Sequence, residues 1–247
     1  MRLTNFIRPV AVAVLGAMSL GTALAQSNTK VPDLAGFWER KDEFGGGSFG
    51  GTLERIPRAQ VKQEVIEEAK RQAAAQAAGQ VVSFGSKWCL TASYPFFMQH
   101  SAAWDLLQGK DEIVLAPEVH TFARHIYLDG RKHPDAEHLI PSPNGHAIGH
   151  WEGDTLVVDT IGFQGGGGTP GGGRVTKNSH LTERFKLVDG GKTLSVTNTW
   201  DDPSVYLKPH TYEMTYHRSD PATYAFEEYC HADDEAQSGS VAQPVQR

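Results

Sequence analysis

Hydrophobic and polar residues alternate along most of the chain after Trp88. β-branched and aromatic residues recur at every second position, in runs separated by Asp-Gly, Gly-Asp, Asp-Gly-Gly and Ser-Asp-Pro sequences. A period of two is typical of strands with one buried face, and the separating sequences favour tight turns. The runs are EIVLAPEVHTFARHIYLDG, HAIGHWEGDTLVVDTIGF, HLTERFKLVDGGKTLSVTNTW and HTYEMTYHRSDPATYAFEEYC. They predict a mainly β fold, in which an antiparallel meander closes into a barrel.

Before these runs, the pattern changes. The segment DLAGFWER at residues 33–40 predicts a first strand. Pro57 opens a segment that is rich in helix formers, carries a modest apolar stripe, and predicts a surface helix over about residues 57–79. The glycine run at residues 165–173 predicts a mobile surface loop without regular structure, at a barrel mouth.

The first 25 residues have the features of a signal peptide. Arg2 and Arg8 precede an uncharged apolar run that ends in Ala-Leu-Ala at residues 23–25, which matches a charged n-region, an h-region and a cleavage site. We therefore expect export, to the periplasm or out of the cell. The mature chain is then a single domain over residues 26–232, followed by a polar, disordered tail over residues 233–247.

Composition narrows the classes of partner. The net charge is −6 and no basic stripe stands out, which argues against nucleic acid. The apolar core of the signal segment is too short for a convincing membrane span, so we expect no span. Cys89 and Cys230 are the only cysteines, and in an oxidising compartment they form either one disulfide or two separate buried thiols. The oligomeric state stays open.

The turn expected at residues 153–154 sets the register of one hairpin. In this register His146 faces Ile161, and one face of the hairpin is purely apolar. The other face mixes His146, His150 and Asp159 with isoleucine and valine, a mixture that is typical of a cavity lined for a ligand.

The next hairpin places a carboxylate among apolar residues. With residues 190–191 as the loop, Glu183 lies opposite Asn198, in a row that includes Trp200. An unpaired buried carboxylate is costly. Glu183 is therefore either a general acid or base, or a structural carboxylate paired with an arginine such as Arg124.

Further candidates accompany Glu183. Tyr212 and Tyr216 share a face with Glu227 in the last expected hairpin, so Glu227 belongs either to paired acid/base chemistry or to a structural network. Tyr127 and His133 lie where a strand ends, a position at which binding groups often occur.

Metal and cofactor motifs are weak or missing. Eleven histidines are present, but neither HExxH nor paired Cys/His zinc spacing occurs, and no dinucleotide or phosphate-loop fingerprint is found. We expect no cofactor. A metal bound by His146 and His150, with Asp159 or His180 as a third ligand, stays an open alternative.

Several of these segments resemble a large, mostly uncharacterised family of exported bacterial proteins. They are IYLDGRKHP, GHAIGHWEGDTLVVDTIGF, the H-x-x-E-R of residues 180–184 and the ending at residues 227–230. The resemblance spans residues 33–230 and implies a calycin-like barrel; Gly36-x-Trp38 is similar to the Gly-x-Trp of lipocalins. His150 departs from the pattern, in which arginine is more usual. The positions that match are His133, His146, Trp151, Glu152, His180, Glu183 and Glu227.

Two functions are expected from these residues. The first is a cofactor-independent acid/base enzyme, of lyase type, acting on a small aromatic or phenolic molecule in a barrel cavity. Its catalytic residues would be Glu183, His146, Arg124 and Tyr127. Substrate would contact His133, His180, Asn198, Trp200, Tyr212, Tyr216 and Glu227. The alternative is a non-catalytic periplasmic binding protein of lipocalin type, and a structural envelope domain is a third possibility.

Overall fold

The structure is a computed structural model of the chain. It describes residues 31–40, 57–78, 94–95, 98, 103–118, 122–166, 168–169 and 171–220. The predictions for the signal segment, the two cysteines, Glu227 and the tail fall outside these residues.

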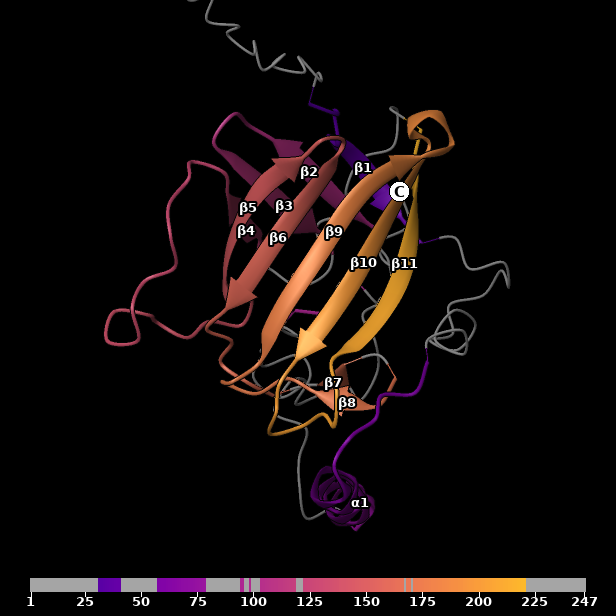
Figure 1. The fold of residues 1–247 in the computed structure, drawn as a ribbon. Coiled ribbons are helices and arrows are strands. Elements are labelled where there is room, and N and C mark those ends of the chain that lie inside the picture. Colours follow the sequence, from indigo (N-terminus) through magenta and orange to yellow (C-terminus); the bar gives the residue numbers. More distant parts are fainter. Residues whose placement is uncertain are drawn as a thin grey trace, which may run out of the picture.

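Nine strands of the described chain form a closed barrel (Figure 1). They are β1 (Gly36–Glu39), β2 (Trp104–Gln108), β3 (Glu112–Pro117), β4 (Arg124–Tyr127), β5 (His146–Glu152), β6 (Thr155–Ile161), β9 (His180–Val188), β10 (Thr193–Asp201) and β11 (His210–Arg218). Neighbours in the barrel follow one another along the chain, and β1 pairs with both β2 and β11 to close the ring. The predicted mainly β barrel is confirmed.

One pair of strands departs from the predicted antiparallel meander. β4 and β5 run parallel, with Ile126 beside Ala147 and Tyr127 beside Ile148. A closed ring with an odd number of strands cannot alternate in direction at every step, so a ring of nine needs such a pair. A parallel pair also needs a long crossover. Residues 128–145 supply it, and they project from the barrel beside β4 and β5 (left in Figure 1).

Both predicted hairpin registers are present. His146 lies opposite Ile161 across the turn between β5 and β6, where Gly153 takes a φ of +64°. Glu183 lies opposite Asn198 between β9 and β10. The turn position and the alternation were sufficient to predict the register, because a shift by one residue would move the apolar side chains of a strand to its other face.

The barrel interior is filled by large apolar side chains. Trp38, Trp104, Trp200, Phe163 and Phe185 are each at most 1% exposed. Burying side chains of this size is the main favourable contribution to folding, roughly 2–3 kcal/mol for each.

A cation lies over an aromatic ring where the first and last strands of the barrel meet. The Arg218 guanidinium lies 4.4 Å from the centroid of the Trp38 ring, and it also donates hydrogen bonds to the backbone oxygens of Asp33, Ala35 and Gly191. The first strand is therefore tied to the last by side-chain as well as ladder contacts.

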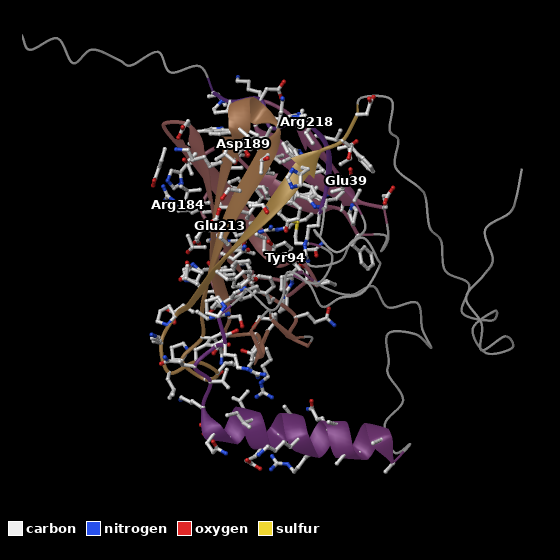
Figure 2. All side chains as sticks on the ribbon, turned by 90° about the vertical axis from the view of Figure 1, so that its right-hand side faces the viewer. Glu39, Tyr94, Arg184, Asp189, Glu213 and Arg218 are labelled. Atoms are coloured by element: carbon white, nitrogen blue, oxygen red, sulfur yellow. The ribbon has the colours of Figure 1, made fainter. Side chains whose placement is uncertain are left out.

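The helix α1 (Gln63–Ala77) lies beyond the opposite end of the barrel (Figures 1 and 2). It begins later than Pro57, where the sequence predicted its start. Val61 forms a bridge with Tyr206, and the Lys62 amide donates to the Val205 oxygen at 2.9 Å. This pairing holds the segment extended, against its helical propensity. No helix of the described residues is long and apolar enough to cross a membrane.

The glycine run is more ordered than the sequence predicted. Residues 168–169 form β7 (Gly168–Thr169), which pairs with β8 (Gly173–Arg174) in a small separate sheet. Gly171, at the turn, has a φ of +83° and lies so close to Pro57 that a Cβ atom would be 2.4 Å from its oxygen. The prediction of no regular structure is wrong here, because glycines that prevent a long strand still permit a tight hairpin.

Candidate functional site

The wall of the barrel separates the candidate residues into two groups. Successive side chains of a strand point to opposite faces, so the register decides the side of each residue. Arg124, Glu183, Asn198, Trp200, Tyr212 and Tyr216 are buried inside. Tyr127, His133, His146 and His180 are on the outer side. The mixed face of β5 and β6, expected to line a cavity in the barrel, is the outer face, because Ala147, Leu156 and Val158 occupy the core.

Inside the barrel, Glu183 is held by an arginine. Nη1 of Arg124 donates to Oε1 of Glu183 at 3.0 Å, Nη2 donates to Oε2, and Nη2 also donates to Thr160 Oγ1 at 2.9 Å. The side chains of Arg124 and Glu183 are 1% and 0% exposed. The partner named in the structural alternative is therefore present, while a catalytic role of Glu183 stays a prediction.

Tyr94 completes this interior cluster, and the sequence did not single it out. Its hydroxyl donates to Glu183, and the Arg124 guanidinium lies 4.0 Å from the centroid of its ring. Burial, and then the Glu183 charge, raise the pKa of Tyr94 well above its ordinary value, so the phenol stays a donor. No periodic pattern marked Tyr94, because its contacts come from strands far along the chain.

The other interior candidates use their polar atoms within the protein. Trp200 Nε1 donates to the Tyr212 hydroxyl oxygen at 3.1 Å, and Asn198 Nδ2 donates to the Val196 oxygen at 3.1 Å. The Tyr216 hydroxyl donates to the Met98 oxygen at 2.8 Å, and burial raises its pKa. These bonds satisfy buried groups, as a packed core requires.

On the outer face, three histidines and one aspartate form a hydrogen-bonded chain. Nδ1 of His146 lies 2.8 Å from Nδ1 of His133, and Nε2 of His133 lies 2.8 Å from Oδ1 of Asp159. Nε2 of His180 lies 2.5 Å from Oδ2 of the same carboxylate. We call these four residues the histidine cluster. Their side chains are only partly exposed: 15% for His133, 38% for Asp159 and 45% for His180.

Two levels of structure build the histidine cluster. Asp159 on β6 pairs with Ile148 on β5 and with Thr182 on β9. His146 and His180 each lie two residues from one of these partners, so they are diagonal neighbours of Asp159 on the same face. His133 comes from the crossover, which folds over the two strands. The sheet register therefore provides three members, and the parallel connection provides the fourth.

The carboxylate sets the tautomers of the two facing histidines. Asp159 can only accept, so His133 donates to it from Nε2; in the singly protonated form of His133, the lone pair is then on Nδ1. That lone pair accepts the Nδ1 proton of His146, since two lone pairs cannot face each other at 2.8 Å. The remaining lone pair of His146 is on Nε2, which makes this atom the basic one.

Electrostatics divide the histidine cluster into a base and an ion pair. Burial, and then the neighbouring His133 and Arg131, lower the pKa of His146, which keeps the ring neutral near neutral pH. The hydrogen bond to Asp159 raises the pKa of His180, and the bonds from His180 and His133 lower the pKa of Asp159. Groups whose pKa values are pushed apart within one cluster are typical of acid/base sites.

His146 also forms part of the wall of a surface groove of about 270 Å³. The groove lies where the segments that lead into β4 and β5 are still apart, on the N-terminal side of the two residue pairs that join these strands. Asn144 bridges the gap, since its Nδ2 donates to the oxygens of Phe122 and Ala123 at 3.2 and 3.3 Å. The lining residues are Phe122, Ala123, His125, Tyr127, Ser142, Pro143, Asn144, Gly145, His146 and Ala147.

Of these lining residues, only Tyr127 and His146 were predicted from the sequence to be site residues. The ring centroids of Tyr127 and His146 are 5.5 Å apart, so the two side chains form one aromatic corner. Phe122 and Asn144 were not predicted as site residues, because the crossover brings their two segments together only in the folded structure.

His146 and His150, the pair considered for a metal site, do not meet in the structure. His150 lies apart from the histidine cluster and contacts Glu152, with Nε2 3.2 Å from Oε1. Within the described ranges, no three His, Cys, Asp or Glu side chains are arranged to hold a metal ion.

Comparison with known proteins leaves the family open. No family model matches the chain, and no curated protein matches it. The resemblance to exported bacterial proteins stays a prediction.

Proposed function

We propose that this protein is a cofactor-independent acid/base enzyme of lyase type, which acts on a small aromatic or phenolic molecule in the groove. We further propose that it works in the periplasm, as the N-terminal segment suggests. One observation carries the proposal. In the wall of a groove, Nε2 of His146 has no hydrogen-bond partner among the described residues, and its Nδ1 is hydrogen-bonded to a second histidine that is oriented by a carboxylate.

The arrangement has the parts that proton abstraction needs. His146 would take a proton at Nε2 and become an imidazolium, whose Nδ1–H is already directed at His133. The new charge is shared toward His133, and Asp159 stabilises it there. In many sites of proton abstraction, the base is oriented by a hydrogen bond to a second group, and a third group orients the second. Hydrogen bonds to charged groups contribute about 1.5–3 kcal/mol each, which offsets part of the cost that burial and the nearby charges impose on the imidazolium of His146.

The outer groove is a better candidate than the barrel interior. Glu183 accepts hydrogen bonds from Arg124 and Tyr94 and is fully buried, so its oxygens already have donors. His146 is partly exposed, and no described residue is hydrogen-bonded to its Nε2. The interior residues therefore support the barrel, and the groove supplies the reacting group.

A generic probe of proton abstraction tests the proposal. Nitrobenzisoxazole is a small planar aromatic molecule; when a base removes its ring proton, the N–O bond breaks and a coloured nitrophenolate forms. His146→Asn should lower the rate at least 100-fold, within the roughly 10²–10⁴-fold typical of general-base catalysis. His150→Asn is the matched control, because His150 lies on the same strand and face but outside the groove. Equal rates for the two variants, with equal melting temperatures, would refute the proposal.

The aromatic walls of the groove also favour the second candidate, a binding protein without catalysis. In that case, small aromatic ligands would raise the melting temperature while the probe is turned over no faster than by His146→Asn.

A further inference from the structure

Two basic side chains at the groove already have carboxylate partners. Arg131 donates from Nε to Oδ1 and Oδ2 of Asp129 at 2.9 and 3.0 Å, and from Nη2 to Oδ2 at 2.6 Å. Nδ1 of His125 lies 2.7 Å from Oε1 of Glu112. The hydrogen bonds from Arg131 hold the pKa of Asp129 down to about 2, so Asp129 stays charged opposite Arg131 throughout the physiological range.

Arg131 nevertheless lies at the edge of the groove. Its guanidinium is 3.8 Å from the centroid of the Tyr127 ring, and Tyr127 lines the groove. The groove thus has a cation within reach, but the donors of this cation are already directed at Asp129. A ligand carboxylate that left water to enter would find no unpaired cation among the described lining residues, and burying an unpaired charge is unfavourable.

The remaining surface suits a flat apolar molecule. Phe122 lines the groove and is 55% exposed, so its ring is accessible to a ligand there. Tyr127 and His146 form the facing aromatic corner, and aromatic rings bind one another in offset or edge-to-face geometry.

We propose that the groove selects neutral aromatic molecules, such as phenols and aryl ketones, over aryl carboxylates, because Asp129 already occupies the Arg131 guanidinium. This inference names the substrate class of the proposed enzyme and rests on the same groove. It removes decarboxylation of phenolic acids from the candidate reactions and leaves eliminations that begin with proton abstraction from an uncharged molecule.

A matched pair of probes tests this selectivity. Para-hydroxyacetophenone and para-hydroxybenzoate have nearly the same size and shape and differ in the charge of one substituent. Their affinities for the full chain are measured from shifts in the NMR signals of His146 and Phe122. The ketone should bind at least about 10-fold more tightly, a difference of about 1.4 kcal/mol. Equal affinity, tighter binding of the benzoate, or binding of neither probe would overturn the inference.

A single substitution should reverse the preference. Asp129→Asn frees the Arg131 charge, and it keeps the oxygen that accepts the Arg131 amide at 3.1 Å in the native turn. The benzoate should then bind about 5- to 10-fold more tightly than to the native protein, while the ketone is unaffected. Asp135→Asn is the control, since it removes an exposed carboxylate of the same crossover that pairs with His138. An equal gain for both probes in Asp129→Asn would contradict the argument.

The binding test of selectivity can fail or succeed independently of the turnover test of the proposed enzyme. Binding is measured without turnover, so selective binding without conversion of nitrobenzisoxazole would refute the enzyme and keep the selectivity. Conversion of nitrobenzisoxazole, with equal binding of the ketone and the benzoate, would support the enzyme and refute the selectivity.

Discussion

Glu183→Gln should destabilise the protein strongly, because it leaves the Arg124 charge buried without its counter-ion. Three donors converge on the carboxylate, two from Arg124 and one from Tyr94. A glutamine amide retains one acceptor oxygen and presents an NH2 group to the remaining donors. Removing one partner of a buried ion pair costs about 3–5 kcal/mol. For a domain of this size, that corresponds to a fall of roughly 10 °C in melting temperature.

A double-mutant cycle separates the pair from simple loss of packing. Arg124→Met alone should cost a similar amount, since it strands the carboxylate. The double variant should be less destabilised than the sum of the single variants by about 2–3 kcal/mol, because neither charge is then left unpaired. The assay is urea unfolding followed by fluorescence of the buried tryptophans, among them Trp38 and Trp200.

The control for this cycle is Glu213→Gln. Glu213 is labelled in Figure 2 and accepts a hydrogen bond from Ser195 at an exposed site. The substitution should change the unfolding free energy by less than about 0.5 kcal/mol. If Glu183→Gln proved as stable as this control, the carboxylate would not be a structural anchor. Loss of turnover in such a stable variant would then support the catalytic alternative for Glu183.

Two further predictions concern the outer face and the glycine hairpin. Asp159→Asn should bring the pKa of His180 down toward its ordinary value, measured by NMR titration, because Asp159 is what raises it. The ion pair stabilises the fold only where both groups are charged: its contribution disappears as pH falls through the lowered pKa of Asp159 and as pH rises through the raised pKa of His180. The stability difference between native and variant should therefore be largest near pH 5 and smaller at pH 8, and a difference that grows toward pH 8 would contradict this assignment. Gly171→Ala should lower the melting temperature more than Gly172→Ala, because both glycines have positive φ but only at Gly171 would a Cβ collide, with Pro57 and His210. Equal losses would show that backbone strain alone matters at this turn.

Much of the barrel could be read from local patterns. Strand periodicity and the glycine turns determined the registers that place His146 opposite Ile161 and Glu183 opposite Asn198. These features depend on neighbours within one hairpin, where chain connectivity leaves few alternatives. The start of α1 was less predictable, because the segment before it pairs with Tyr206, far along the chain.

The composition of the site was decided by tertiary structure. Alternation determined that His146 and Asp159 share a face and that the purely apolar face packs in the core. It predicted a cavity for the mixed face, which lies on the outer side of the barrel. Closure of nine strands required one parallel pair, and its crossover carries His133 to Asp159 and creates the groove beside His146. Tyr94 joins Glu183 only through contacts across the core. The sequence by itself therefore determined which residues are neighbours along and across a hairpin. The closed barrel decided which of them meet in a site, because such meetings depend on segments that are distant in the chain.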